Sequence, residues 1–337
     1  MRPLRVLLAD DSPLFFRWVE TELSHETLTI VGRAQNGADA CAMVERLAPD
    51  LVLMDVHMPV MGGLDAVAAI MARRPTPIVM VTGDPRGEEG ALAFEALRRG
   101  ARDLIPKPSR WRLGPAERVA WRRKLHALAG RGGATRSAPP PARPPRTDAA
   151  RPAEVIGVGA STGGPAALAA FLGGLPSTLS VPVLVVQHLA PGFVDGLARW
   201  LARDTRLAVR VAVDGERPSA GDVLIAPDGA HLSWPGARVR IEPARGGHVP
   251  SIDVLFGSLA RSRGAAALGV LLTGMGTDGV EGMAALHEAG ALTLAQDAES
   301  SVVWGIPGAA AARGVVAELG SPASLARLAA RATRRVA

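Results

Sequence analysis

The amino-acid sequence predicts two α/β domains, each built on a doubly wound and mainly parallel sheet. In both halves of the 337-residue chain, short apolar runs alternate with helical patterns. This alternation is typical of strands that are buried on both faces and connected by helices. Between the halves, Gly130 to Pro152 holds six prolines and five arginines and has no apolar period. We therefore expect a first domain at residues 1–125, a basic helix end and semi-rigid linker at 126–152, and a second domain at 153–337.

The composition indicates a globular protein whose positive charge is concentrated in one stretch. Apolar residues make up 48% of the chain and charged residues 21%, which is enough for a core in each domain. Residues 110–152 hold eleven Lys and Arg against two acidic residues, so this stretch has a net charge of +9. The net charge of the whole chain is +6, and the remaining residues therefore sum to −3. This stretch is interpreted as a solvated helix face and linker, or as a docking surface for an acidic partner. No aromatic interleaving accompanies it, so nucleic acid is not expected as a partner.

Cysteine content and hydropathy point to a reducing compartment. Cys41 is the only cysteine, so disulfides within the chain and cysteine metal sites are excluded, and we expect an inert packed thiol in a helix over 38–47. The apolar run Val6 to Ala9 is too short for the core of a signal peptide. Glycine and proline interrupt the uncharged residues 155–194, so no membrane insertion is expected. The cytoplasm is the expected location.

Five apolar runs predict the strands of the first domain, and helical patterns separate them. These runs are Leu4–Ala9, Leu28–Val31, Leu51–Met54, Ile78–Val81 and Leu104–Ile105. In a doubly wound sheet, ligands bind where the strands reach their carboxyl ends. The residues at these ends are therefore the candidates for function.

Acidic and phosphate-binding residue types gather at these strand ends. Asp10 and Asp11 close the first strand, Asp55 the third and Thr82 the fourth, and Lys107 follows the fifth. Three converging carboxylates repel one another unless a hard cation such as Mg²⁺ neutralises them. A carboxylate in this position can attack a phosphoryl group while the metal and the lysine absorb the developing charge. The threonine could then hydrogen-bond the phosphate and sense it.

The segments around these residues, Leu-Leu-Ala-Asp-Asp-Ser, Met-Asp-Val-His-Met-Pro and Pro-Lys-Pro, resemble the receiver domain of two-component response regulators. The resemblance extends over residues 4 to about 125. It implies that a partner histidine kinase phosphorylates Asp55, and that Asp10, Asp11 and Asp55 hold Mg²⁺. Two departures stand out, because Leu104 replaces the usual switching aromatic and Gly62-Gly63 replaces the usual acidic-glycine pair. The first puts in question the threonine-aromatic form of the switch.

In the second domain, apolar runs again alternate with helical patterns. The predicted strands are Val155–Val158, Val183–Gln187, Val209–Val213, Val223–Ile225, Leu268–Leu272 and Leu292–Ala295. The predicted helices include Ala166–Phe171, Val194–Ala202, Ile252–Ser262 and Gly279–Ala289. Turn signals at Pro227-Asp228-Gly229 and Pro235-Gly236 predict an antiparallel hairpin in the middle of the domain.

A glycine-rich turn follows the first of these strands. Gly159-Ala160-Ser161-Thr162-Gly163 matches G-x-S-x-G, the spacing that places a serine on a sharp strand-to-helix turn. The N–H groups at the start of the next helix favour an anion over this serine, either a phosphate or a transient oxyanion. A turn that only packs well is one alternative, and a dinucleotide loop is another. The nucleotide interpretation is weaker because Thr162 occupies the third glycine position and the next strand ends in His188, not in an acid.

A serine nucleophile needs a base and an orienting carboxylate from other strand ends. Of the seven histidines, only His188 directly follows a long buried strand, whereas His231 and His248 lie in turn-rich segments. Asp278 and Asp297 both qualify as the carboxylate, and their positions in the sequence do not decide between them.

Over nearly all of residues 154 to 335, the chain resembles the catalytic domain of the chemotaxis protein-glutamate methylesterases. The matching segments are Gly-Ala-Ser-Thr-Gly-Gly, Gln-His-Leu-Ala-Pro-Gly-Phe, Val-Pro-Ser-Ile-Asp-Val-Leu-Phe, Leu-Thr-Gly-Met-Gly-Thr-Asp-Gly and Ala-Gln-Asp-Ala-Glu-Ser-Ser-Val-Val. The resemblance implies Ser161 as nucleophile, His188 as base and then acid, and Asp278 as the orienting carboxylate. It also implies that the backbone N–H of Met275, helped by Thr162, forms the oxyanion hole. Leu189 replaces the family's usual methionine.

The resemblance further implies hydrolysis of glutamate γ-methyl esters on chemoreceptors, with release of methanol, and deamidation of receptor glutamines. No cofactor is expected for the ester chemistry. In this family the unphosphorylated receiver covers the catalytic face, so phosphorylation is expected to stimulate turnover during chemotactic adaptation. Two alternatives are a binding module with a decayed enzyme domain and a DNA-binding response regulator. The intact serine, histidine and aspartate argue against a decayed enzyme domain. A DNA-binding regulator is not supported, because the sequence after residue 153 shows no helix-turn-helix pattern.

Overall fold

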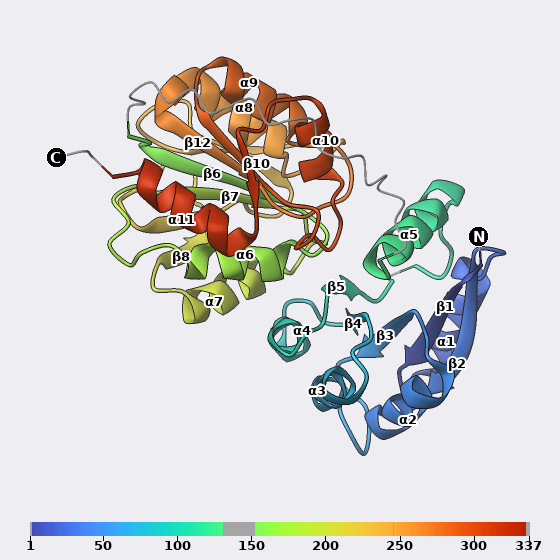
Figure 1. The fold of residues 1–337 in the computed structure, drawn as a ribbon. Coiled ribbons are helices and arrows are strands. Elements are labelled where there is room, and N and C mark those ends of the chain that lie inside the picture. Colours follow the sequence, from blue (N-terminus) through green and yellow to red (C-terminus); the bar gives the residue numbers. More distant parts are fainter. Residues whose placement is uncertain (1, 109, 131–151, 245, 335–337) are drawn as a thin grey trace. The chain divides into compact units, whose positions relative to one another are not determined.

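The computed structural model describes residues 2–108, 110–130, 152–244 and 246–334. The chain divides into two compact units, Met1–Gly133 and Ala134–Ala337. Figure 1 shows that each unit is a sheet accompanied by helices. Most of the predicted linker, residues 131–151, lies outside the described residues. Within the described ranges, no helix is both long enough and apolar enough to cross a membrane.

The first unit contains a five-stranded sheet with the order β2-β1-β3-β4-β5, and all of its strand pairs are parallel. The strands are β1 (Leu4–Ala9), β2 (Leu28–Ala34), β3 (Leu51–Asp55), β4 (Ile78–Thr82) and β5 (Asp103–Pro106). The helices are α1 (Pro13–Leu23), α2 (Gly37–Leu47), α3 (Gly63–Arg73), α4 (Glu88–Arg98) and α5 (Pro115–Leu128). Each predicted strand of this domain is present, and Cys41 is buried in α2 as expected.

The second unit contains a seven-stranded sheet with the order β14-β13-β12-β6-β7-β9-β8, which is parallel at every pair. Its strands are β6 (Val155–Ala160), β7 (Val183–Gln187), β8 (Ala208–Val211), β9 (Asp222–Ile225), β12 (Ala267–Leu271), β13 (Leu292–Gln296) and β14 (Glu318–Gly320). The sequence analysis predicted all of these except β14, whose three half-buried residues are too few to show a pattern.

The helices of this unit are α6 (Gly164–Gly173), α7 (Val194–Asp204), α8 (Ile252–Arg263), α9 (Val280–Glu288), α10 (Ile306–Ala312) and α11 (Pro322–Ala332), with a short 3₁₀ turn at Gly264–Ala266. The predicted hairpin is also present. It consists of β10 (Ala230–Ser233) and β11 (Arg240–Pro243), which pair antiparallel and form a sheet of their own.

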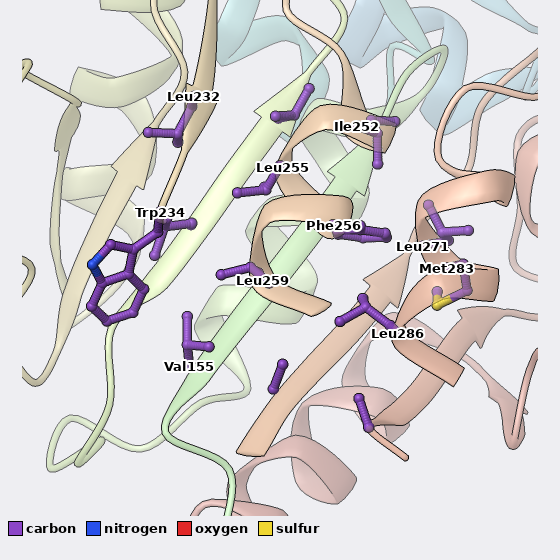
Figure 2. Packing of buried hydrophobic residues seen from close by; sticks show 14 of the residues in the cluster. Val155, Leu232, Trp234, Ile252, Leu255, Phe256, Leu259, Leu271, Met283 and Leu286 are labelled. Atoms are coloured by element: carbon purple, nitrogen blue, oxygen red, sulfur yellow. The ribbon is translucent and has the colours of Figure 1, made fainter. Parts of the chain in front are cut away.

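Helix α8 packs very closely against the sheet because two residues of β6 are glycines. A Cβ on Gly157 would lie 2.7 Å from Leu259 Cδ1, and a Cβ on Gly159 would lie 2.4 Å from Ile252 Cγ2. Figure 2 shows Ile252, Phe256 and Leu259 on α8, within a core cluster of fully or nearly fully buried residues. Glycine therefore permits an approach that no larger residue allows. As a result, the first turn of α8 lies beside the carboxyl end of β6, where the candidate nucleophile follows.

Candidate active site

Ser161 directly follows β6, in the sharp turn that the G-x-S-x-G spacing predicts. Its N–H donates to Thr273 O at 3.0 Å, and its own carbonyl accepts from Gly164 N at 2.7 Å. Gly163 caps α6 with φ of 76°, a left-handed conformation that favours glycine. The turn is therefore held by main-chain bonds, and the Ser161 side chain is half-buried.

Gln187 supports this turn from the neighbouring strand, a role that the sequence analysis missed. Its side-chain amide nitrogen donates to Ser161 O at 2.8 Å and to His188 O at 2.9 Å. A Cβ on Gly164 would lie only 1.9 Å from Gln187 Oε1, so glycine is required for this contact. The only signal in the sequence was a polar residue at the end of a buried strand. One buried side chain thus links the backbones that carry the serine and the histidine.

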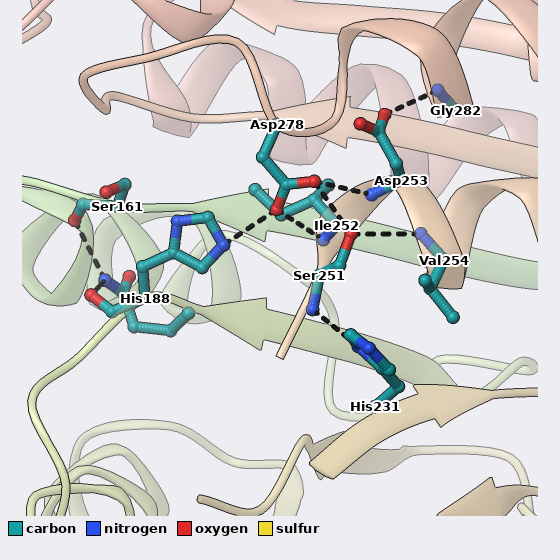
Figure 3. A network of polar contacts seen from close by, with 10 residues as sticks. Ser161, His188, His231, Ser251, Ile252, Asp253, Val254, Asp278 and Gly282 are labelled. Atoms are coloured by element: carbon teal, nitrogen blue, oxygen red, sulfur yellow. Dashed lines mark hydrogen bonds and ion pairs between the residues drawn. The ribbon is translucent and has the colours of Figure 1, made fainter. Parts of the chain in front are cut away.

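His188 and Asp278 form a direct hydrogen bond across the strand ends. His188 Nε2 lies 2.8 Å from Asp278 Oδ2, and the two side chains are 16% and 5% exposed. An ionised carboxylate can only accept, so Nε2 carries the proton, and in the neutral imidazole Nδ1 then keeps its lone pair. In Figure 3, Ser161 lies on the opposite side of the imidazole from Asp278. Among the described residues no hydrogen bond yet joins the Ser161 hydroxyl to this ring, and such bonds are often long before substrate binds.

The Asp278 carboxylate is held at the amino-terminal end of α8. Its Oδ1 accepts from Ser251 Oγ at 2.8 Å and from Asp253 N at 3.2 Å, and its Oδ2 accepts from Ile252 N at 2.8 Å. Burial alone would raise the pKa of Asp278, but the hydrogen bonds from His188, Ile252, Ser251 and Asp253 outweigh it and hold that pKa well below its usual range. The carboxylate is therefore ionised and oriented.

Asp297, the other carboxylate that the sequence left open, has a different partner. Its Oδ1 accepts from Ser300 N at 2.9 Å and from Ser300 Oγ at 2.6 Å, which closes a local turn after β13. Asp278, not Asp297, is hydrogen-bonded to His188. Tight aspartate turns of this kind are common in loops.

Two further histidines come close to this group. The His248 ring stacks on the His188 ring, with centroids 5.0 Å apart and planes 8° apart. His231 Nδ1 accepts from Ser251 N at 3.1 Å, next to the Asp278 anchor. Their positions in turn-rich segments indicated nothing of this proximity. His287 lies in the last turn of α9.

Of the two predicted oxyanion donors, Thr162 directly follows the serine, and Met275 follows a glycine that packs against it. Gly274 packs against Ser161 so tightly that a Cβ on it would lie 2.7 Å from Ser161 Cβ, which brings Met275 next to the turn. In the part of the chain that the structure describes, the hydrogen bonds of this region use neither Met275 N nor Thr162 N as donor. Preorganised N–H groups beside a nucleophile are the arrangement that stabilises a tetrahedral oxyanion.

In the first unit, the predicted acidic residues meet at the carboxyl edge of the sheet. One carboxylate oxygen from each of Asp10, Asp11 and Asp55 lies within 4.8 Å of the others. Lys107 Nζ lies 2.8 Å from Asp10 Oδ2 and 2.9 Å from Asp55 Oδ2. Burial, and then the Asp10 carboxylate, raise the pKa of Asp55 to about 6, while Lys107 opposes the shift. The three carboxylates, two of them buried and that of Asp11 exposed, form an all-oxygen donor set that fits Mg²⁺.

Thr82 ends β4 beside this cluster, and its hydroxyl donates to Glu89 Oε2 at 2.8 Å. Leu104, which replaces an aromatic, is buried in β5. The sequence analysis did not single out Glu89, because a glutamate in the first turn of a helix is common.

The comparisons with known proteins agree with this arrangement. Residues 156–329 match the family described as CheB methylesterase, and residues 6–113 match the response regulator receiver domain. The protein-glutamate methylesterase/protein-glutamine glutaminase 2 of Anaeromyxobacter dehalogenans is 44% identical, over 94% of this chain and 93% of that protein. A protein of Geobacillus kaustophilus described as protein-glutamate methylesterase/protein-glutamine glutaminase is 39% identical, over 94% and 95% of the two chains.

A solved structure supports the same assignment for the second unit. The crystal structure of the Thermotoga maritima CheB methylesterase catalytic domain is 30% identical, with a TM-score of 0.51, over 53% of this chain and 98% of that chain. The chain therefore belongs to the CheB methylesterase family and carries an amino-terminal response regulator receiver domain.

Proposed function

We propose that this protein hydrolyses glutamate γ-methyl esters on chemoreceptors, releases methanol, and deamidates receptor glutamines. The observation that carries the proposal is the His188–Asp278 hydrogen bond of 2.8 Å, with Ser161 on the other side of the imidazole. The names of the relatives in Anaeromyxobacter and Geobacillus supply the substrate class. In the assigned roles, Ser161 is the nucleophile, His188 the general base and acid, and Asp278 the orienting carboxylate.

In the first half of the reaction, His188 Nδ1 takes the proton of Ser161 Oγ as this oxygen attacks the ester carbonyl carbon. The N–H groups of Met275 and Thr162 hold the tetrahedral oxyanion, and one such donor is typically worth about 2.7–4 kcal/mol. The carbonyl re-forms, the bond to the methoxy oxygen breaks, and His188 returns the proton so that methanol leaves. The product is a glutamyl ester of Ser161.

In the second half, His188 takes a proton from water, and the hydroxide oxygen attacks the glutamyl ester. The oxyanion is held by the same two N–H groups, and the proton passes to Ser161 Oγ as glutamate is released. An amide enters the same sequence, with ammonia leaving in place of methanol. Deamidation of glutamine therefore needs no additional group.

The first unit is proposed to regulate this reaction through phosphorylation of Asp55 by a histidine kinase. Asp10, Asp11 and Asp55 would hold Mg²⁺, which when bound neutralises charge on the transferred phosphoryl group. Lys107, whose Nζ lies 2.9 Å from Asp55 Oδ2, would balance the same charge, and Thr82 at the end of β4 would contact the phosphoryl oxygens. We place the receiver at residues 1–125, the linker at 126–152 and the catalytic domain at 153–337, and the site of action in the cytoplasm.

Methanol release from methylated chemoreceptor tests the proposal. Wild type should release methanol faster when a small phosphodonor and Mg²⁺ are present, whereas Ser161→Ala should fall to the level of the reaction without enzyme. Ser180→Ala is the matched control, since it removes a serine hydroxyl that donates to Thr333 O elsewhere in the unit. Asp55→Ala should show no stimulation by the phosphodonor. Unchanged methanol release by Ser161→Ala would contradict the assigned nucleophile.

A further inference from the structure

Ser251 makes more hydrogen bonds at the Asp278 anchor than helix capping requires. It is the N-cap of α8, and its Oγ accepts from Val254 N at 3.3 Å. The same Oγ donates to Asp278 Oδ1 at 2.8 Å, and Ser251 N donates to His231 Nδ1 at 3.1 Å. Figure 3 shows the side chain between the carboxylate and the first turn of the helix. The residue is 8% exposed, so water does not readily replace these bonds.

The anchor gives each oxygen of Asp278 two donors. Oδ1 has the Ser251 hydroxyl and Asp253 N, while Oδ2 has Ile252 N and His188 Nε2. The two backbone donors are free N–H groups of the first helical turn, where the helix dipole also favours a negative charge. Removing the hydroxyl would leave Oδ1 with one long bond of 3.2 Å, and the carboxylate could then rotate away from the imidazole.

We propose that Ser251 is a positioning residue for the ester hydrolysis, acting on His188 through Asp278. This inference rests on the proposed function. The Ser251 hydroxyl keeps the carboxylate plane in the orientation that receives His188 Nε2–H, and the lone pair of Nδ1 consequently stays directed toward Ser161. Ser251 bonds Asp278, Val254 and His231 and acts on the reaction only through Asp278, so it should affect kcat and not substrate binding.

The test is a comparison of Ser251→Ala, Ser251→Thr and Ser321→Ala in methanol release. A hydrogen bond to a buried charge corresponds to a rate factor of about tenfold to a hundredfold. Ser251→Ala should therefore lower kcat by this factor with KM unchanged within about twofold, and Ser251→Thr, which keeps the hydroxyl, should restore most of it. Ser321 is the matched control because it caps α11 in the same way, accepting from Ser324 N at 3.4 Å.

Ser321→Ala should lower the thermal unfolding midpoint through the loss of its helix cap and leave kcat unchanged. If Ser251→Ala and Ser321→Ala have equal kcat, Ser251 is only a cap and the inference is wrong. A parallel rise in KM would also contradict it. If wild type itself releases no methanol, the result contradicts the proposed function as well as this inference.

A second, independent observation concerns the Thr82 hydroxyl. Glu89 Oε2 accepts from Thr82 Oγ1 at 2.8 Å, from Gly83 N at 2.9 Å and from Asp84 N at 3.1 Å. Gly83 lies between this carboxylate and the lysine that contacts Asp55, since a Cβ on it would be 3.7 Å from Glu89 Oε2 and 3.9 Å from Lys107 Cδ. An anion therefore already occupies donors at the edge of the acidic cluster.

The geometry points to Glu89 as an internal competitor for the phosphoryl group on Asp55. The hydroxyl of Thr82 cannot donate its one proton to Glu89 and to a phosphoryl oxygen at once. Phosphorylation would have to displace the carboxylate of Glu89, a residue in the first turn of α4, from its donors in the loop after β4. The displaced carboxylate would be the moving part of a switch that has Leu104 in place of an aromatic.

Phosphorylation by a small acyl phosphate with Mg²⁺ tests this second inference. Glu89→Gln should reach several-fold more phosphorylated protein than wild type at the same donor concentration. Glu88→Gln is the control, because it removes a neighbouring exposed charge of the same helix turn. Equal or lower phosphorylation in Glu89→Gln than in Glu88→Gln would overturn the inference. Labelling that persists in Asp55→Asn would instead disprove the assigned phosphoacceptor.

Discussion

His188 donates to Asp278 through Nε2, at 2.8 Å, so the nitrogen that remains for Ser161 is Nδ1. The direction of this hydrogen bond follows from the charge of the Asp278 carboxylate. Burial would raise the pKa of Asp278, but the hydrogen bonds that the carboxylate accepts outweigh burial and hold the pKa low. A carboxylate that stays ionised selects the imidazole tautomer with the proton on Nε2. The base that activates the serine is therefore chosen by the partner on the far side of the ring.

Asp278→Asn should nearly abolish turnover while leaving the fold intact. An asparagine amide can donate to Nε2, which would place the imidazole proton on Nδ1 and leave no base for Ser161. In another serine hydrolase the equivalent change costs about 10⁴ in kcat, and we expect about three to four orders of magnitude here. Methanol release checks the rate, and circular dichroism checks the fold. An asparagine variant with more than about a tenth of wild-type kcat would refute the tautomer argument.

Gly164→Ala should reduce activity more than stability. The new Cβ would lie 1.9 Å from Gln187 Oε1 and would push away the amide that holds Ser161 O and His188 O. Gly173→Ala in the same helix has open space around it, so it should be neutral or stabilise by about 0.5–1 kcal/mol. For both variants, urea unfolding measures the free energy of unfolding and methanol release measures kcat. Equal kcat in the two would show that the Gln187 link is dispensable.

Phe256→Ala should destabilise the second unit by about 3–5 kcal/mol. The ring is fully buried on α8, beneath the turn that holds Asp278. Val213→Ala, at a side chain that is 65% exposed, should change stability by less than about 0.5 kcal/mol. Denaturant unfolding followed by fluorescence measures both. A loss below about 1 kcal/mol for Phe256→Ala would mean that the cluster in Figure 2 repacks easily.

Without Mg²⁺, Asp55→Asn should stabilise the first unit at pH 7.5 by on the order of 1 kcal/mol. Burial and the Asp10 carboxylate raise the pKa of Asp55 to about 6, so the folded state prefers its protonated form. The stability that the protonated Asp55 contributes is fully present below the ordinary aspartate pKa and is lost as pH rises through about 6. Asparagine is neutral throughout, so its advantage should shrink between pH 7.5 and pH 5.

Thermal unfolding with and without Mg²⁺ measures this effect. The unfolding transition whose midpoint temperature Mg²⁺ raises in wild type is assigned to the first unit. Asp65→Asn serves as control, because it removes a carboxylate that is 73% exposed. Mg²⁺ should no longer raise the midpoint in Asp55→Asn. A stability difference that grows toward pH 5 would contradict the raised pKa.

The sequence by itself determined the α/β class, nearly all strand positions and the turn that presents Ser161. These features are local, because strand burial and glycine-rich turns leave a pattern within a few residues. His188 was found in the same way, as the polar residue after a buried strand. From the residues alone the orienting carboxylate stayed open between Asp278 and Asp297, and only the family resemblance favoured Asp278.

The tertiary structure decided which of these residues meet. In the order β13-β12-β6-β7, the strands before Ser161 and His188 are neighbours, and β12, which precedes Asp278, adjoins β6 on its other side. Asp297 follows β13, one strand further out, and each step across a sheet adds about 4.7–4.9 Å. The supports at Gln187, Ser251 and His248 could not be found from the sequence, because their partners lie in distant segments. Sheet order and the close approach of α8 to β6 are properties of packing, which no local pattern records.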